Sequence, residues 1–466
     1  MPGRAPSIRR FRFINGFTAG ITAGITSRLT AALALLALPW CATAQDLFQV
    51  YRDAQSYDAV FAAARHSLEA GRERLPQGRA LLLPTLNLSG QASRARNELD
   101  SRDPLILPSV TRYPETASYT LTFTQPLFRY QNWIQYEQAG HQVRQAEAVF
   151  GQAYQDLIVR VAQAYFDVLA AQDTLGLVRA QREAISEQLA QAKRNFEVGT
   201  ATITDTHEAQ ARYDLSGAQE IAAQNDLESK RRALQLLTGK ETGEVKPLRA
   251  DIRLTPPNPN DMQTWVDIAE KQSYQVQIAE SAAEVASLEA KRNTAAHLPT
   301  LDFFATHGQT GASATTDSVA GRDTTQTVIG LQLAMPLFQG GALTSRDRES
   351  AALALRSRED LENARRNAAL SARQNYLAVI NGIAQVSALE QALVSSQSAL
   401  DSNKLGYEVG VRINIDVLNA QQQLFLTRRD LAVARYNTIT NTLRLKAAAG
   451  SLREEDLVEV NRALAL

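Results

Sequence analysis

The chain carries one stretch of sequence twice, roughly 210 residues apart. Residues 196–205 read FEVGTATITD and residues 407–416 read YEVGVRINID, so Gly199 and Gly410 are separated by 211 residues (410 − 199). Two prolines, Pro126 and Pro336, keep nearly this spacing at 210 residues (336 − 126), and an LPTL motif at 83–86 returns at 298–301. A duplication of this length predicts two copies of one large structural unit, because loops absorb small changes of spacing.

Residues 1–44 have the pattern of an export signal. They contain five arginines and no acidic residue, a short apolar run at 29–38, and the small residues Ala42-Thr43-Ala44 before Gln45. We therefore expect the mature chain to begin at Gln45, and the Arg9-Arg10 pair leaves the twin-arginine route as a less favoured alternative. Cys41 is the only cysteine, so the mature chain would contain neither disulfides nor thiols.

Charge and hydropathy exclude two classes of protein. Removing five of the 49 basic residues leaves 44 against 49 acidic ones, a net charge near −5 (44 − 49). The sequence contains no stripe of Lys and Arg with interleaved aromatic residues, which is the pattern that indicates nucleic-acid binding. After the signal we find no apolar run of the ~20 residues that a membrane-spanning helix needs. If the chain lies in a membrane, we expect strands to hold it there.

Each copy is predicted to contain a very long helix. Apolar residues between Leu157 and Phe196 recur at steps of three and four, the pattern of a packed coiled coil. The 68 positions from Gln131 to Val198 (198 − 131 + 1) contain no proline. At ~1.5 Å per residue such a helix would be about 100 Å long. A rod of this length spans a compartment or bridges two partners.

Short alternating segments predict strands in the two copies. The apolar members alternate with polar or small residues and are Leu86, Leu88, Tyr119, Leu121, Phe123, Leu301, Phe303, Ile329, Leu331 and Leu333. The polar stretches 97–116 and 307–326 are predicted to be hairpin loops. A small soluble sheet packed on a helix is the alternative, but the apolar faces of the long helices are already used. Bacterial membrane barrels need at least ~8 strands, so four per chain cannot close one and three chains would supply twelve.

The expected domains follow from these elements. They are a signal peptide (1–44); a first repeat (45–255) with strands at 85–97 and 117–125 and helices at 131–198 and 204–239; and a second repeat (256–466) with strands at 300–306 and 327–335, helices at 342–409 and 414–450, and a C-terminal equatorial segment. The loop PPNPN at 256–260 separates the repeats. Pro126 and Pro336 are predicted to mark the strand–helix junctions, because proline cannot donate to a ladder and tolerates a helix start.

The order and spacing of several motifs resemble the TolC family of outer-membrane channel-tunnels, from about Gln45 to the end of the chain. The motifs are the paired Val-Gly tips, LPTL before the strands, QGG at 339–341, ARYN at 434–437 and REEDL at 453–457. The resemblance implies a homotrimer with a twelve-stranded outer-membrane β-barrel, continued by a barrel of helices in the periplasm. It also implies docking to a periplasmic adaptor and to an inner-membrane ABC-type or proton-driven transporter.

The resemblance further implies roles for particular residues. A periplasmic gate would be held by Gln188, Thr204, Asp205, Tyr407 and Arg412, with Asp205 receiving the Tyr407 hydroxyl and the Arg412 guanidinium. Adaptor docking would use the tips Val198, Gly199, Thr200, Val409, Gly410 and Val411. Asp416 would face the pore, and Asn419 stands where the family has a second aspartate. We therefore predict one ring of carboxylates and weaker block by multivalent cations.

No motif indicates an enzyme, a cofactor or a metal site. The five histidines, His66, His141, His207, His297 and His307, have no partner at metal-ligand spacing, and no phosphate-binding loop or nucleophile elbow is present. The leading hypothesis is an outer-membrane exit duct for secreted proteins, small toxic molecules or both. The alternative from another class is a periplasmic coiled-coil scaffold protein.

Overall fold

The computed structural model of the chain describes residues 45–102, 109–249, 252–313 and 320–465. The predicted signal peptide lies outside these residues. Two long helical hairpins dominate the described part. They are α5 (Tyr130–Glu197, 68 residues) with α6 (Ile203–Thr238, 36 residues), and α9 (Ala342–Glu408, 67 residues) with α10 (Asn414–Ala448, 35 residues).

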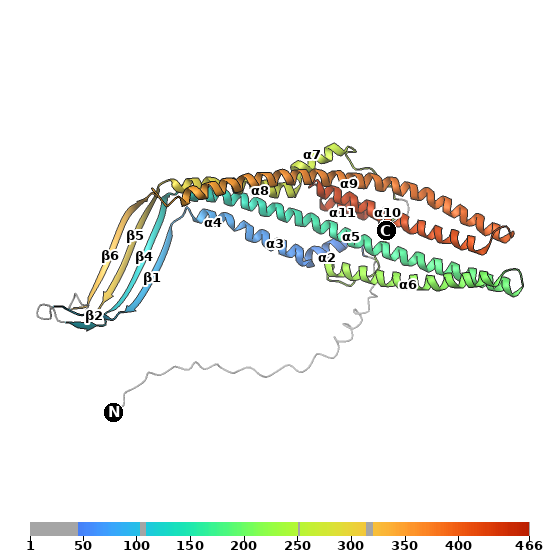
Figure 1. Cartoon of the computed structure of the whole chain (residues 1–466), viewed down its shortest axis with the longest axis horizontal. Helices are drawn as coiled ribbons and strands as arrows, with labels where there is room; N and C mark the ends of the chain where they lie inside the picture. The colour runs from blue at the N-terminus through green and yellow to red at the C-terminus, as the bar shows by residue number, and fades with distance from the viewer. Residues whose placement is uncertain (1–44, 103–108, 250–251, 314–319, 466) are drawn as a thin grey trace, which may run out of the picture. The chain divides into compact units, whose positions relative to one another are not determined.

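Shorter helices precede each hairpin and end the chain. They are α2 (Leu47–Tyr57), α3 (Ala59–Arg72), α4 (Arg74–Ala80), α7 (Met262–Gln272), α8 (Tyr274–Thr294), the 3₁₀ helix η1 (Ala295–His297) and α11 (Glu454–Arg462). Helices α3, α4 and α8 lie along α5, while α7 and α8 lie along α9 (Figure 1). The order of short helices, strand pair, long helix and shorter helix thus occurs in both halves.

Four antiparallel strands lie side by side in the order β1 (Thr85–Arg94), β4 (Glu115–Phe128), β5 (Thr300–Ala312) and β6 (Arg322–Ala334) (Figure 1). Along the chain, β1 and β4 are connected by a small separate hairpin of β2 (Asn97–Leu99) and β3 (Val110–Arg112). The second strand pair extends well beyond the predicted apolar segments, because polar and glycine residues at 307–312 and 322–326 continue the ladder. The prediction that 307–326 is entirely a loop was therefore wrong; backbone pairing overrides the polar composition.

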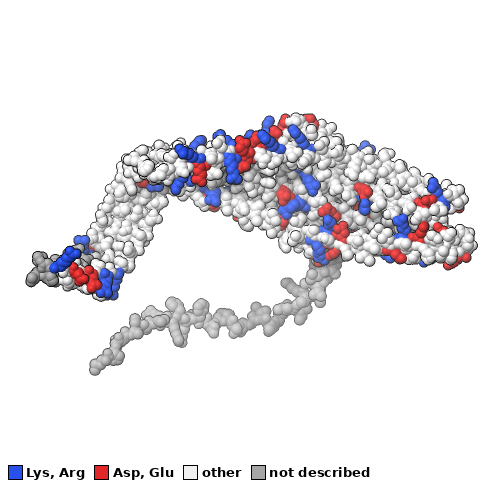
Figure 2. Space-filling view, viewed as in Figure 1, with Lys and Arg blue, Asp and Glu red and all other residues white. Residues whose placement is uncertain are grey.

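The strand register places apolar residues together on one face of the sheet. Leu88 lies opposite Leu121, and Phe303 lies opposite both Gln125 and Leu331. Directly opposite residues share a face, so the apolar side chains identified from the sequence lie on one face, whereas Thr120, Thr122 and Thr124 of β4 lie on the other. In Figure 2 the strands in view are almost free of charge between a charged loop end and the helices.

The two strand–helix junctions are built differently. Strand β4 continues through Pro126 and ends at Phe128, with a register shift between these residues, so this proline does not end the strand as predicted. Arg129, which precedes α5, makes two hydrogen bonds of 2.8 and 2.6 Å to the buried carboxylate of Asp302. Pro336 lies between β6 and α9, and Gly341 at φ 83° precedes the helix. Glycine adopts this left-handed backbone without steric cost.

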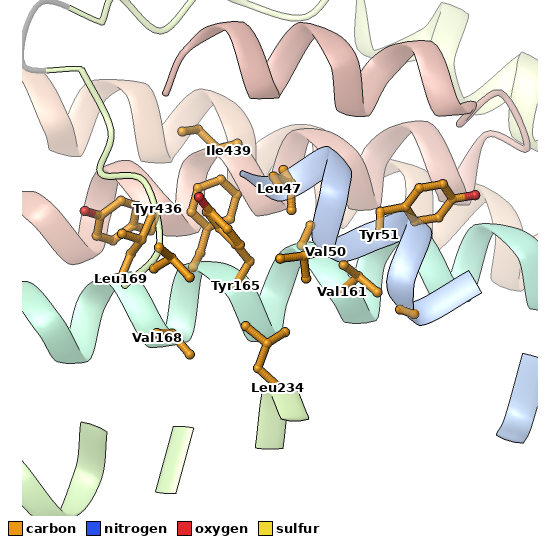
Figure 3. Packing of buried hydrophobic residues seen from close by; sticks show 14 of the residues in the cluster. Leu47, Val50, Tyr51, Val161, Tyr165, Val168, Leu169, Leu234, Tyr436 and Ile439 are labelled. Carbon is orange, nitrogen blue, oxygen red and sulfur yellow. The ribbon is translucent and has the colours of Figure 1, made fainter. Parts of the chain in front are cut away.

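The largest apolar core lies where α2, α5, α6, α10 and the C-terminal segment meet (Figure 3). The rings of Phe166 and Tyr436 are stacked at 5.6 Å between centroids. The buried Tyr165 hydroxyl lies within hydrogen-bond distance of two carbonyl oxygens that can accept its proton, those of Gln45 at 3.1 Å and Lys246 at 3.0 Å. This core therefore joins the first described residues to the middle of both hairpins.

Among the helices of the described residues, one is long and apolar enough to cross a membrane, by length and composition. It is α9, in which one 18-residue window has a mean hydropathy of 1.4. The expectation that no such window follows the signal was therefore wrong by this measure. However, α9 is 67 residues long and packs against α7, α8 and α10. Its apolar residues recur at coiled-coil spacing, which raises hydropathy without requiring lipid contact.

Candidate functional site

The two hairpins end in tips of nearly identical backbone. Helix α5 ends at Glu197 and α9 at Glu408, and each is followed by a valine and then a glycine at φ 78°. In the first tip the N–H of Thr200 donates to the carbonyl of Asn195 at 2.8 Å; in the second the N–H of Val411 donates to the carbonyl of Gly406 at 2.9 Å. These bonds satisfy helix carbonyls that would otherwise lack partners, and the positive φ requires glycine.

The tips present apolar side chains to the surroundings. Val198 is 73% exposed, Val409 64% and Val411 76%. Thr200 is exposed as well, and its hydroxyl donates to the carbonyl of Asn195. The predicted tip residues therefore form two similar surfaces beside a glycine turn, with Val198 and Thr200 on the first and Val409 and Val411 on the second.

Behind the tips, each hairpin is held by its own apolar contacts. In the first, Ile185, Leu189 and Ala192 of α5 pack with Ala209 of α6; in the second, Leu400 of α9 packs with Val417 and Leu424 of α10. Leu418 of α10 also reaches the cluster of the first hairpin. Each hairpin is thus a rigid pair of helices, and the two are adjacent near their tips.

Two of the predicted gate residues join the hairpins. The Gln188 amide of α5 donates to the side-chain oxygen of Asn414 on α10 at 2.6 Å, and the Asn195 amide donates to the Tyr407 hydroxyl at 3.2 Å. Asn414 is completely buried and donates to the carbonyl of Asp205 at 3.5 Å. The sequence analysis did not identify Asn195 or Asn414, whose importance depends on how the hairpins pack.

Asp205 makes different contacts from those that the resemblance implies. Its carboxylate accepts from the backbone N–H of Thr202 at 3.0 Å and from the Thr202 hydroxyl at 2.8 Å, which completes a capping box at the start of α6. In the described part of the chain the Asp205 carboxylate contacts neither Tyr407 nor Arg412. Arg412 instead lies 3.7 Å from the carboxylate of Asp416, and Thr204 is exposed on the first turn of α6.

The two predicted pore residues line one groove. Asp416 and Asn419 share a groove of about 560 Å³ between α9 and α10 with Arg412, Asn403 and other small polar residues. The amide oxygen of Asn419 accepts from Arg212 of α6 at 2.9 Å, and Gln422 accepts from the same guanidinium at 2.6 Å. No sequence pattern indicates Arg212, because it lies among ordinary surface residues of a helix.

Charged and buried polar groups connect the helices farther from the tips. Hydrogen bonds from Arg182 and Arg179 hold the pKa of Glu220 below its usual range, which joins α5 to α6. Burial raises the pKa of Asp173, although the Tyr436 hydroxyl donates to it at 2.5 Å. These contacts lie within or between the hairpins and contain no arrangement of nucleophile and base.

The described residues contain no group of three or more His, Cys, Asp or Glu side chains that could hold a metal ion. His297 lies 3.1 Å from Asp347, and His66 lies 2.9 Å from Glu69, as isolated pairs. What the site offers is a set of polar links between two rigid hairpins and two exposed tips.

Comparison with known proteins assigns this architecture. The family model described as outer membrane efflux protein matches residues 50–240 and 265–451. The chain is 31% identical to the outer membrane protein TolC of Vibrio cholerae over 433 residues, covering 92% of this chain and 96% of that protein. It is 33% identical to the alkaline protease secretion protein AprF of Pseudomonas aeruginosa over 432 residues, covering 91% and 88% of the two chains.

The fold is also similar to solved structures. The outer membrane protein VceC of Vibrio cholerae matches with a TM-score of 0.73 at 19% identity, covering 87% of this chain and 96% of that chain. At this identity the likeness concerns the fold.

Proposed function

The chain belongs to the family of outer membrane efflux proteins, and from this premise we propose that it is the exit duct of a tripartite export system. It lies in the outer membrane, with its helical part in the periplasm, and it is a channel protein rather than an enzyme. The observation that carries the proposal is the open four-stranded sheet with one apolar face.

Three copies of the chain close this sheet into a barrel. Strands β1 and β6 are the two edges, and each leaves backbone groups unpaired on one side within the chain. In lipid every such group must be paired, which an open edge does not allow. Because β1 and β6 run in opposite directions, β6 of one copy pairs antiparallel with β1 of the next. Three copies give twelve strands, an even number within the range of bacterial barrels.

The helical hairpins continue the barrel as a periplasmic tunnel. Helix α5 follows β4 after one residue and α9 follows β6 after a short connection, so six long helices and six shorter ones surround one axis in a trimer. Two related repeats per chain place six similar tips at the far end. Their exposed valines and glycine turns bind a periplasmic adaptor, which is in turn bound to an inner-membrane transporter.

Closure of the tunnel depends on the links around the tips. Gln188 and Tyr407 hold the hairpins of one chain together, and we assign Thr204, Asp205 and Arg412, which lie at the same level, to the same gate. Each link is a hydrogen bond or an exposed ion pair, worth roughly 0–3 kcal/mol. Docking of partner proteins provides enough binding energy to break several of them. Opening therefore requires no nucleotide site in this chain.

The cargo is a secreted protein, a small toxic molecule or both. The name of AprF refers to secretion of an alkaline protease, and the name of the family refers to efflux. Deleting the gene and measuring both protease secretion and susceptibility to toxic dyes and detergents separates these cargo classes.

Biochemical fractionation tests the duct itself. The purified mature protein should come from the outer-membrane fraction as a detergent-solubilised trimer that dissociates on heating, and it should form channels in planar lipid bilayers. A protein that stays monomeric and water-soluble without detergent would fit a periplasmic scaffold and reject the duct.

A further inference from the structure

The plane between the two hairpins of one chain is more polar near the tips than the interior of either hairpin. Inside each hairpin the helices bury apolar side chains against each other. Between the hairpins, Leu418 of α10 is the apolar residue that reaches the cluster of the first hairpin. The other contacts are polar: Gln188 with Asn414 joins α5 to α10, and Asn195 with Tyr407 joins α5 to α9. Polar contacts can be exchanged for contacts with water, whereas exposed apolar surface cannot be compensated in that way. The hairpins therefore separate from each other more easily than either one opens.

Arg212 makes two of the contacts across this plane. Its guanidinium projects from α6 and donates to the side-chain oxygens of Gln422 at 2.6 Å and Asn419 at 2.9 Å. These acceptors are three residues apart on α10, so they lie on the same face of that helix. The planar guanidinium presents several N–H groups in a fixed arrangement, which allows one side chain to hold both acceptors at once. Arg212 is partly buried in this position.

We propose that Arg212 is a latch that keeps the two hairpins of each chain together in the closed tunnel. The inference rests on the proposed function, because it assigns the latch to the gate of a channel. Hydrogen bonds from a charged donor are stronger than those between neutral groups. Both acceptors are neutral amides, so separating the hairpins does not require an ion pair to be pulled apart. The latch is thus firm at rest and releasable on docking.

This arrangement explains the amide at position 419. A carboxylate there would form an ion pair with Arg212 and would hold α6 to α10 more tightly. In the Asn419→Asp variant Arg212 would also neutralise the added negative charge, so the three new carboxylates of a trimer would not act as a second ring that binds cations. Restoring a second ring therefore requires the double change of Asn419→Asp with Arg212→Gln.

Single-channel recording in planar lipid bilayers tests the latch with purified trimers. We expect Arg212→Gln to raise the ratio of open to closed time about tenfold or more, because one charge-assisted hydrogen bond per chain has that order of effect. Arg212→Lys should restore part of the closure, since a single ammonium group cannot reproduce the guanidinium geometry. Arg232→Gln is the matched control, because the Arg232 guanidinium donates to Glu228 and Gln235, which lie on α6 like Arg232 itself.

Block by a trivalent cation provides a second readout. Asn419→Asp alone should lower the ratio of open to closed time and leave block by the trivalent cation unchanged. The double variant, Asn419→Asp with Arg212→Gln, should be blocked more strongly than the parent. Strong block of Asn419→Asp alone would overturn the latch, since the new carboxylate would then be free of Arg212. The latch would also be overturned if Arg212→Gln had the same ratio of open to closed time as the parent and as Arg232→Gln.

Two controls separate failure of the latch from other failures. If Arg212→Gln does not assemble, Gln422→Ala removes one acceptor while leaving the arginine, and it should raise the open ratio several-fold; no rise would overturn the latch. A parent protein that forms no channels at all would reject the proposed duct, and the latch with it. If channels form normally but every Arg212 variant has the same ratio of open to closed time as the parent, the latch alone is rejected.

Discussion

The Asp58 carboxylate performs two tasks at one buried position, and its replacement makes a quantitative prediction. It is the N-cap of α3 and accepts from the backbone N–H of Phe61 at 2.9 Å. It also accepts from Arg160 of α5 at 2.9 Å, and the two side chains are 6% and 29% exposed. The pair therefore fixes the short N-terminal helices to the first long hairpin.

The two tasks have different free energies. Loss of an N-cap side chain costs about 1 kcal/mol, and loss of hydrogen bonds to a charged partner costs about 1.5–3 kcal/mol. Arg160 keeps its 2.7 Å contact with Asp156, so removing Asp58 does not leave the guanidinium without a partner. We expect Asp58→Ala to lower the free energy of unfolding by about 3 kcal/mol and Asp58→Asn, which can still cap, by about 1–2 kcal/mol.

The same carboxylate predicts a dependence on pH. Burial raises the pKa of Asp58, but hydrogen bonds from Arg160 and Phe61 outweigh it and hold the pKa below the ordinary 3.8. A carboxyl whose folded pKa is lowered stabilises the fold above the unfolded pKa, and this contribution is lost as the pH falls through the folded value. The stability difference between the parent and Asp58→Asn should therefore be constant above about pH 5 and shrink below pH 3.8.

Denaturant unfolding of the purified protein in detergent, followed by circular dichroism, measures these differences. Equal stabilities of Asp58→Ala and Asp58→Asn would show that the cap contributes nothing. A difference between parent and Asp58→Asn that stays the same from pH 6 to pH 3 would refute the role assigned to the charge.

Two further predictions concern the second hairpin. A Cβ at Gly382 would lie 2.5 Å from the Thr438 hydroxyl, so Gly382→Ala should lower the free energy of unfolding by about 1–3 kcal/mol. A Cβ at Gly176 has nothing within 4 Å, so Gly176→Ala should be neutral or stabilising. Equal thermal stability of the two variants would contradict the packing argument. At the tip, Tyr407→Phe combined with Arg412→Ser removes the contacts to Asn195 and Asp416 and should raise the resting conductance, and single-channel closure identical to the parent would count against their place in the gate.

The long helices could be predicted from the sequence because their signals are local. No proline occurs from Gln131 to Val198, and apolar residues recur at steps of three and four between Leu157 and Phe196; α5 occupies Tyr130–Glu197. The strands were underestimated, since their outer halves are paired through polar residues and glycine that also occur in loops. Backbone pairing does not depend on the side-chain type in such segments, so composition could not locate their ends.

The contacts between hairpins could not be predicted, because they depend on the relative placement of helices far apart in the sequence. Asn414 and Arg212 are ordinary helix residues by composition. Their roles arise only where α10 crosses α5 and α6. A resemblance transfers residue positions but not such pairings, which explains why Gln188 and Tyr407 join the hairpins while Asp205 caps its own helix.

The two tips share a backbone turn but differ in how the next helix begins. At the first tip Thr202 and Asp205 form a capping box, so the aspartate three residues after the cap is used locally. At the second tip the cap position is Ile413, which provides no side-chain bond, and Asp416 at the equivalent place is left to contact Arg412. Loss of a cap destabilises a helix start by about 1 kcal/mol. The start of α6 is therefore held more firmly than the start of α10, and the Asp416 carboxylate is available for the contact with Arg412 because it does not complete a capping box.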